Sequence, residues 1–217
     1  MITTDHLERL KNLTPAKRAL LLKHIQKEAT PTEESSLIPR RARLNPSPLS
    51  FAQQRLWFLT RLEPDTPFYN VPTTLSLKGR LDIGALERTV NEIIRRHEVL
   101  RTTFAEADGQ PVQIVAPAKW VILPLIDLSE LPCETREAEA QQLVNNETRR
   151  PLDLTVGPLL RVTLLRLAED EHVLLVTMHH IISDGWSMGL FIREMSALYQ
   201  AFTAGEESPL EELEIQY

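Results

Sequence analysis

The sequence predicts an α/β sandwich in which helices cover a mixed β-sheet. Apolar, strand-like runs alternate with amphipathic helical stretches from Leu49 onward. The stretch 81–101 places Leu86, Val90 and Ile93 at helical spacing, which predicts a long helix with one buried face. The run 157–180 has the pattern of two strands around a polar turn. Together these patterns predict a sheet whose strands are interleaved along the chain with helices.

The remaining elements follow from periodicity and from turn residues. Gly79 stops a strand-like run over 70–79, and Asp108-Gly109 is a hairpin signal between two β-prone runs within 100–115. The other predicted elements are a helix over 51–64, an extended run over 120–128, an outer polar helix over 132–150 and an amphipathic helix over 187–205.

Three segments are expected along the chain. Residues 1–28 form a helical, linker or docking segment, because Thr14 suits an N-cap and Pro15 suits a first helical turn. This segment is either an adaptor or a helix packed on the domain that follows. Residues 29–47 form a proline-rich, charged linker, and residues 48–217 form the main domain. The ending "PLEELEIQY" leads toward a further element, so we expect the chain to be truncated at Tyr217.

Composition excludes several functional classes. The chain has 217 residues, with Lys+Arg 24 against Asp+Glu 30 and a net charge of −6. This mildly acidic balance argues against a general nucleic-acid or anionic-membrane binder. No apolar stretch reaches the roughly 18 residues of a membrane span, and no secretory signal pattern occurs, so we expect a cytoplasmic protein. Cys133 is the one cysteine, which leaves no internal disulfide framework.

The stretch "MHHIISDGWS", Met178 to Ser187, concentrates polar residues between an apolar run and a helical pattern. Adjacent residues of a strand face opposite sides, so His179 and His180 are not expected to address one ligand. A metal site from His180 and Asp184 would need a further ligand from elsewhere. An active-site loop, a metal site and the polar end of a buried strand all remain open at this point.

A catalytic interpretation of this stretch depends on the imidazole of His180. A neutral imidazole suits proton removal near neutrality, and no G-x-S-x-G elbow supplies a nucleophilic serine. The histidine would therefore act on a substrate amine or alcohol that attacks an activated acyl group. Asp184 would orient the ring or anchor the loop through an arginine, and Gly185 would allow a positive φ or a close approach. A buried histidine pair that caps a strand is an equally open alternative.

Three motifs in order resemble the condensation domains of nonribosomal peptide synthetases. They are "SFAQQRLWFL" at 50–59, "RHEVLRTTF" at 96–104 and "HHIISDG" at 179–185, the last matching H-H-x-x-x-D-G. The resemblance covers 46–217 and corresponds to the N-terminal half of such a domain. It implies a chloramphenicol-acetyltransferase-like lobe with a mixed, largely antiparallel sheet. The motifs are most similar to domains that join an L-configured donor to an L-configured acceptor, and starter domains for fatty acyl donors remain an alternative.

The family implies a reaction and its partners. An upstream donor and a downstream acceptor peptidyl carrier protein would each deliver a thioester on a 4'-phosphopantetheine arm, and the acceptor amine would attack the donor thioester. No cofactor or metal would be bound by the domain itself. The site would also require a C-terminal lobe, and an adenylation domain would follow. The isolated fragment is expected to be incomplete; a non-catalytic carrier-binding or scaffold module and a stand-alone acyltransferase are the alternatives.

The resemblance also assigns roles within the last motif. His180 would be catalytic, as a general base or by positioning the amine, and His179 would be structural. Asp184 would be structural too, with Arg96 or Arg101 as its ion-pair partner, and Gly185 would leave room for the pantetheine or acyl group. The substrate-channel candidates are Ser183, Trp186 and Ser187.

The other two motifs are expected to serve mainly as scaffold. Glu98 and Arg101 are expected to form an internal ion pair, and His97 is expected to be a satisfied core histidine on the apolar face of its helix. The core candidates of the first motif are Phe51, Leu56, Trp57 and Leu59.

Overall fold

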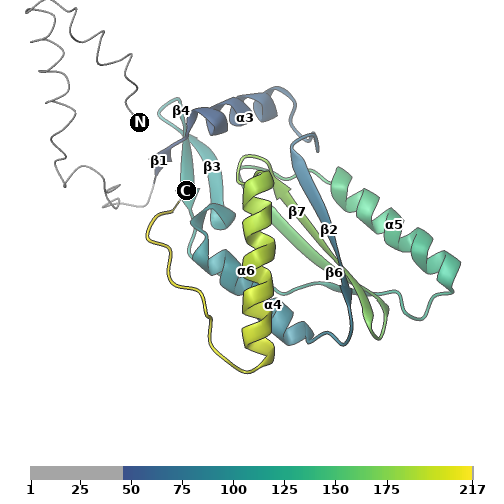
Figure 1. The fold of residues 1–217 in the computed structure, drawn as a ribbon. Coiled ribbons are helices and arrows are strands. Elements are labelled where there is room, and N and C mark those ends of the chain that lie inside the picture. Colours follow the sequence, from purple (N-terminus) through teal and green to yellow (C-terminus); the bar gives the residue numbers. More distant parts are fainter. Residues whose placement is uncertain (1–45, 217) are drawn as a thin grey trace, which may run out of the picture. The chain divides into compact units, whose positions relative to one another are not determined.

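The computed structural model describes residues 46–216 (Figure 1). The predicted helix after Thr14 and nearly all of the predicted linker lie outside these residues. Within them, strands and helices alternate as the sequence predicts, and a mixed α/β architecture is confirmed. None of the described helices is long and apolar enough to cross a membrane.

A four-stranded sheet forms the centre of the fold. Its order is β2-β7-β6-β5, with β2 and β6 antiparallel to β7 and β5 parallel to β6. Asn70 pairs with His179 at one end of the β2–β7 ladder. This register fixes the position of His179, the last residue of β7, in the sheet. The strands are β2 (Asn70–Lys78), β5 (Leu125–Asp127), β6 (Leu160–Ala168) and β7 (Glu171–His179).

A second sheet has three strands in the order β1-β4-β3, all antiparallel. Asp108 and Gly109 have φ values of 52° and 72°, so the predicted hairpin turn is present and uses left-handed backbone at both central positions. The sequence pattern led us to expect one mixed sheet, and the structure corrects this, because the hairpin pairs with a strand before α3. The strands are β1 (Ser47–Pro48), β3 (Thr102–Ala107) and β4 (Gln110–Val115).

The helices are α3 (Phe51–Leu62), α4 (Ile83–Arg96), α5 (Cys133–Arg149) and α6 (Gly185–Thr203), with a 3-10 turn η1 (Glu98–Arg101) after α4. The helix predicted over 81–101 is therefore shorter than expected, because His97 has extended backbone (φ −99°, ψ 103°) that stops α4. No residue of α5 is buried, which confirms its predicted outer position.

Figure 1 shows α4 and α6 on one side of the four-stranded sheet and α5 on the other. The core lies mainly between the sheet and the α4–α6 pair, and it includes Leu86, Ile93, Leu174 and Leu198. Trp57 belongs to this core as predicted. Phe51 does not: its side chain is 90% exposed. The first residue of α3 projects away from the helix face that the core covers.

The segment after α6 runs back to the end of α4. An Nη1 of Arg96 donates to the carbonyl of Leu210 at 3.3 Å. The side chain of Gln216 makes two bonds there: it donates to the Arg96 carbonyl at 2.9 Å and accepts from the Glu98 amide at 3.0 Å. These contacts tie the motif at 96–104 to residues 206–216, which are far away in sequence.

Candidate active site

The histidine motif lies where β7 ends and α6 has not yet begun. His179 is the last residue of β7, and its amide donates to the carbonyl of Leu159 at 3.0 Å. The amide of His180 donates to the carbonyl of Tyr69 at 2.8 Å, on the side of β2. The sheet thus holds the backbone of both histidines, and the chain then turns sharply into α6 at Gly185.

His180 is exposed, and its ring is oriented by the loop itself. Its Nδ1 lies 2.6 Å from the carbonyl oxygen of Ser183. A carbonyl can only accept a hydrogen bond, so Nδ1 carries the proton and Nε2 of the neutral ring carries the free lone pair. No described residue forms a hydrogen bond with Nε2 of His180. The geometry therefore leaves Nε2 of an exposed imidazole as a free hydrogen-bond acceptor within the described residues.

His179 points the other way and is buried, with 2% of its surface exposed. Its Nδ1 accepts a hydrogen bond from the amide of Ile181 at 3.0 Å. Burial, together with the neighbouring charge of His180, lowers the pKa of His179 to about 4. The ring is therefore neutral near neutral pH and holds the loop in shape. The opposite facing expected for adjacent strand residues is present.

Asp184 is the N-cap of α6. Its Oδ1 accepts from the Ser187 amide at 2.8 Å, and the Ser187 hydroxyl accepts from the Asp184 amide at 2.7 Å. These bonds form a capping box, and they lower the pKa of the carboxyl of Asp184, first through the Ser187 side chain. The ion pair predicted between Asp184 and Arg96 or Arg101 is wrong, because this carboxylate serves the helix end instead.

Arg96 has a different acidic partner, Glu194 of α6, which the motifs did not predict. The Nε of Arg96 lies 3.6 Å from Oε2 of Glu194, and Nε2 of His97 lies 2.7 Å from the same oxygen. Arg96 and Glu194 are both buried. The available signal was an acid among the buried apolar positions of α6, next to Met195. His97 is a partnered, half-buried histidine, much as predicted.

Arg101 pairs with an acid of its own turn and with a carbonyl just after β4. Its guanidinium lies 3.5 Å from the carboxylate of Glu98 and donates to the carbonyl of Ala116 at 2.5 Å. The predicted Glu98–Arg101 pair is thus confirmed. The contacts of Arg96 and Arg101 thus stabilise the end of α4 and the β3–β4 hairpin, and neither arginine contacts Asp184 of the histidine loop.

The three channel candidates occupy different environments. Ser183 is buried, and its hydroxyl donates to the carbonyl of His179 at 3.1 Å. This hydrogen bond within the loop uses the hydroxyl that we expected to face a substrate channel. Ser187 is half-buried and belongs to the capping box. Trp186 is 80% exposed on the first turn of α6. Of the three, Trp186 is the side chain most available to a ligand.

Gly185 is the first residue of α6 and does not have a positive φ, so the left-handed backbone considered for it is wrong. A Cβ built at Gly185 would meet no atom within 4 Å. Within the described residues, neither backbone strain nor packing requires a glycine here. The surface next to the loop is open at this position.

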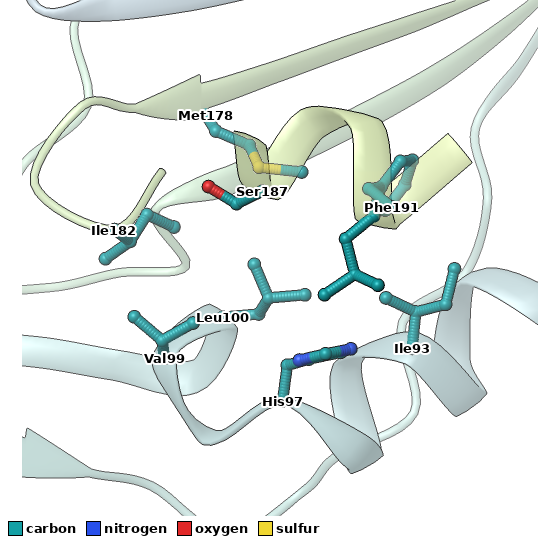
Figure 2. A pocket seen from close by; sticks show the side chains of 9 residues that line it. Ile93, His97, Val99, Leu100, Met178, Ile182, Ser187 and Phe191 are labelled. Carbon is teal, nitrogen blue, oxygen red and sulfur yellow. The ribbon is translucent and has the colours of Figure 1, made fainter. Parts of the chain in front are cut away.

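A small cavity lies beside the loop, between the end of α4, η1 and the first turns of α6 (Figure 2). Met178, Ile182 and Ser187 line it from the motif side, and its volume is about 40 Å³. His180 is not among its lining residues.

Among residues 46–216 no group of three or more histidine, cysteine, aspartate or glutamate side chains could hold a metal ion.

Replacing Asp184 by alanine removes an N-cap from an exposed helix start. We expect Asp184→Ala to lower the free energy of unfolding by about 1 kcal/mol. Asp184→Ser keeps a capping oxygen and is expected to lose less. Urea unfolding of both variants tests this. A loss of about 3–5 kcal/mol in Asp184→Ala would instead indicate a broken buried ion pair.

Burial of His179 makes stability depend on pH. Its pKa is about 4 in the folded chain and near 6.5 in the unfolded chain, so the unfolded state binds more protons between these values. The contribution is fully present above about pH 6.5, and about 3 kcal/mol is lost as the pH falls toward 4. His179→Asn keeps an acceptor for the Ile181 amide and is expected to flatten this slope in urea unfolding. An unchanged slope in the variant would refute the assignment.

A family model described as the condensation domain matches residues 45–217. A linear gramicidin synthase component of Brevibacillus parabrevis is 51% identical over 186 residues, which cover 85% of this chain and 4% of that protein. Phosphinothricin tripeptide synthetase PhsC of Streptomyces viridochromogenes is 41% identical over 213 residues, covering 98% of this chain and 20% of that protein. The chain thus spans a small part of these relatives.

Solved structures agree with these matches. The starter condensation domain of rhizomide synthetase superposes with a TM-score of 0.70 at 28% identity, over 76% of this chain and 40% of that one. The first condensation domain of the calcium-dependent antibiotic synthetase, in complex with a substrate analogue, gives a TM-score of 0.70 at 29% identity, over 76% and 39%. The fold, the ordered motifs and the histidine loop lead to one conclusion: this chain belongs to the condensation domain family of peptide synthetases.

Proposed function

We propose that residues 46–217 are the N-terminal half of a peptide-bond-forming centre, and that Nε2 of His180 acts on the attacking amine. The observation that carries this proposal is the 2.6 Å contact between Nδ1 of His180 and the carbonyl oxygen of Ser183. The Ser183 carbonyl holds Nδ1 as a donor, which leaves Nε2 as an acceptor on an exposed ring. An acceptor at this position suits an amine that must be held and must lose a proton.

The chemistry requires little else from this lobe. The amine nitrogen attacks the thioester carbonyl carbon, the C–N bond forms and the C–S bond breaks. The sulfur leaves and is protonated to a thiol, while the nitrogen loses one proton. A free α-amino group has a pKa of about 8, so most of it is protonated near neutral pH. Nε2 of His180 would accept a hydrogen bond from the neutral amine and take up its proton as the C–N bond forms.

The proposal extends to groups outside the chain. This chain covers about 40% of the solved condensation domain of rhizomide synthetase, which supports a second lobe that closes the site opposite His180. Upstream and downstream carrier proteins would present thioesters on phosphopantetheine arms, and the open surface at Gly185 leaves room for such an arm. One structure of the rhizomide domain has C8-CoA bound. An adenylation domain downstream, a cytoplasmic location and an L-configured donor stay predictions.

Two alternatives remain distinguishable. A starter domain would take a fatty acyl donor, and the likeness to the rhizomide starter domain favours testing this directly. A scaffold module would bind a loaded carrier protein without turnover. Offering both aminoacyl and C8 thioesters as donors to the synthetase that carries this sequence separates these two from the main proposal.

The histidine is tested by substitution. In the synthetase that carries this sequence, we expect His180→Ala to lower the rate of condensation by at least about 10²-fold, the range typical of a lost acid–base group. Val156→Ser serves as the control, because Val156 is exposed and lies outside the loop that holds His180. Condensation at the wild-type rate in His180→Ala would remove His180 from the mechanism.

Helix α3 carries an exposed apolar face that suits the docking of a carrier protein. Phe51, Phe58 and Leu62 are spaced seven and four residues apart, so they share one side of the helix, and they are 90%, 60% and 62% exposed. Exposed apolar residues that share one helix side are a feature of protein interaction sites. We assign it to a carrier protein, since the proposed reaction requires two of them to dock on the domain.

The effect of a variant on carrier docking can be separated from its effect on the reaction by supplying the substrate with and without its carrier protein. We expect the double variant Phe58→Ser/Leu62→Ser to lower turnover of a carrier-tethered substrate about tenfold or more and to leave turnover of the same acyl group on a small free thiol within about twofold. Supplying donor and acceptor in turn on a carrier shows which of the two docks at α3. Val156→Ser, also on an exposed apolar residue, is the control, and equal losses with free thioesters would contradict the assignment.

A further inference from the structure

The cavity beside the histidine loop has apolar walls and a defined size. Val99 lines it from η1, and Met178 and Ile182 line it from the two ends of the loop (Figure 2). Leu190 of α6 also belongs to its lining. Its volume is about 40 Å³. This exceeds the roughly 10–15 Å³ that one water needs and is far below the 150 Å³ of a cavity that binds benzene. The space suits a short alkyl group.

The two polar residues on its wall already have partners. Nε2 of His97 lies 2.7 Å from the carboxylate of Glu194. The hydroxyl of Ser187 is engaged in the capping box with Asp184. An ordered water needs two to four polar partners, and these walls supply few that are not already engaged. The favoured occupant is therefore an apolar group, for which entry costs no unpaired polar atom.

The cavity shares its walls with the loop that carries His180. Met178 lies two residues before His180 and Ile182 lies two residues after it, and Ser187 is hydrogen-bonded to Asp184 of the same loop. The cavity and the His180 ring are thus carried by the same short loop. Met178 of β7 and Phe191 of α6, which both line the cavity, belong to the hydrophobic core.

We propose that this cavity is a selectivity pocket for a short aliphatic side chain on a substrate held at His180. The inference rests on the proposed function, since it assumes that His180 receives an aminoacyl or acyl thioester. The aliphatic group belongs either to the donor or to the acceptor, and the chemistry of recognition is the same for both. One methylene more or less in such a pocket changes kcat/KM by about tenfold or more.

Two variants change the pocket in opposite directions without touching His180. Val99→Ile adds one methylene to its wall, and Leu190→Ala removes most of a side chain from it. The control is Ile192→Ala, which shortens another half-buried aliphatic residue of α6 that packs on the core and does not line the cavity. Thermal unfolding of each variant shows that it is folded, and Val99→Ile alone carries the test if Leu190→Ala unfolds.

The assay uses the synthetase that carries this sequence and two series of small thioesters. One series varies the donor side chain through glycine, alanine, valine and leucine, and the other varies the acceptor in the same way. In one series, Leu190→Ala is expected to raise the kcat/KM for leucine relative to alanine at least fivefold, and Val99→Ile to lower the value for valine relative to alanine by a similar factor. The responding series identifies the substrate that uses the pocket.

Three results would overturn the selectivity pocket while leaving the proposed function standing. They are relative kcat/KM values within twofold of wild type in both series, an equal fall for every side chain, and the same shift in Ile192→Ala. A wild-type synthetase that forms no product with any pair of substrates would instead refute the proposed function, and the pocket with it.

Discussion

A single hydrogen bond, from Nδ1 of His180 to the carbonyl of Ser183, determines what the motif can do. It fixes the tautomer, and with it the nitrogen that faces outward. The bond exists because the loop is short: Ile182 and Ser183 both turn back to the carbonyl of His179. That closure brings a carbonyl within reach of an imidazole only three residues away.

The loop is held in turn by the two elements that it joins. On the strand side, His179 is buried, neutral and bonded to the Ile181 amide, so the turn begins from a fixed backbone. On the helix side, Asp184 and Ser187 cap α6 reciprocally. The residues of the motif thus divide into one outward-facing ring and a set of side chains that keep this ring in place. Activity lost at Asp184 would report on that support, because its contacts are with the helix end.

Much of this was predictable from sequence, and the failures have physical reasons. Strand alternation separated His179 from His180, and Asp108-Gly109 predicted the hairpin turn between β3 and β4. Periodicity predicted α5 as an outer polar helix and α6 as an amphipathic helix. The partner of Arg96 was not predictable from motif order, because Glu194 lies on another helix and is brought close only by the packing of α4 on α6.

Other errors arose from faces and sheets rather than from element types. Phe51 was assigned to the core because aromatic residues are usually buried, yet helical phase puts it with Phe58 on the open side of α3. The division of the strands into two sheets was not predicted either, since local patterns specify strands and not their partners. Gly185 illustrates a third limit: the letter suggested unusual backbone, whereas the structure has an ordinary helix start beside open space.

The bonds of Gln216 have a consequence for the order in which the chain folds. Its side chain satisfies the Arg96 carbonyl and the Glu98 amide, the two peptide groups on either side of the residue where α4 stops. About 120 residues separate the partners, so these hydrogen bonds form only after the ribosome has synthesised Gln216. The junction of α4 and η1, which lines one side of the cavity, therefore gains its last hydrogen bonds only after α4 and the histidine loop have been synthesised.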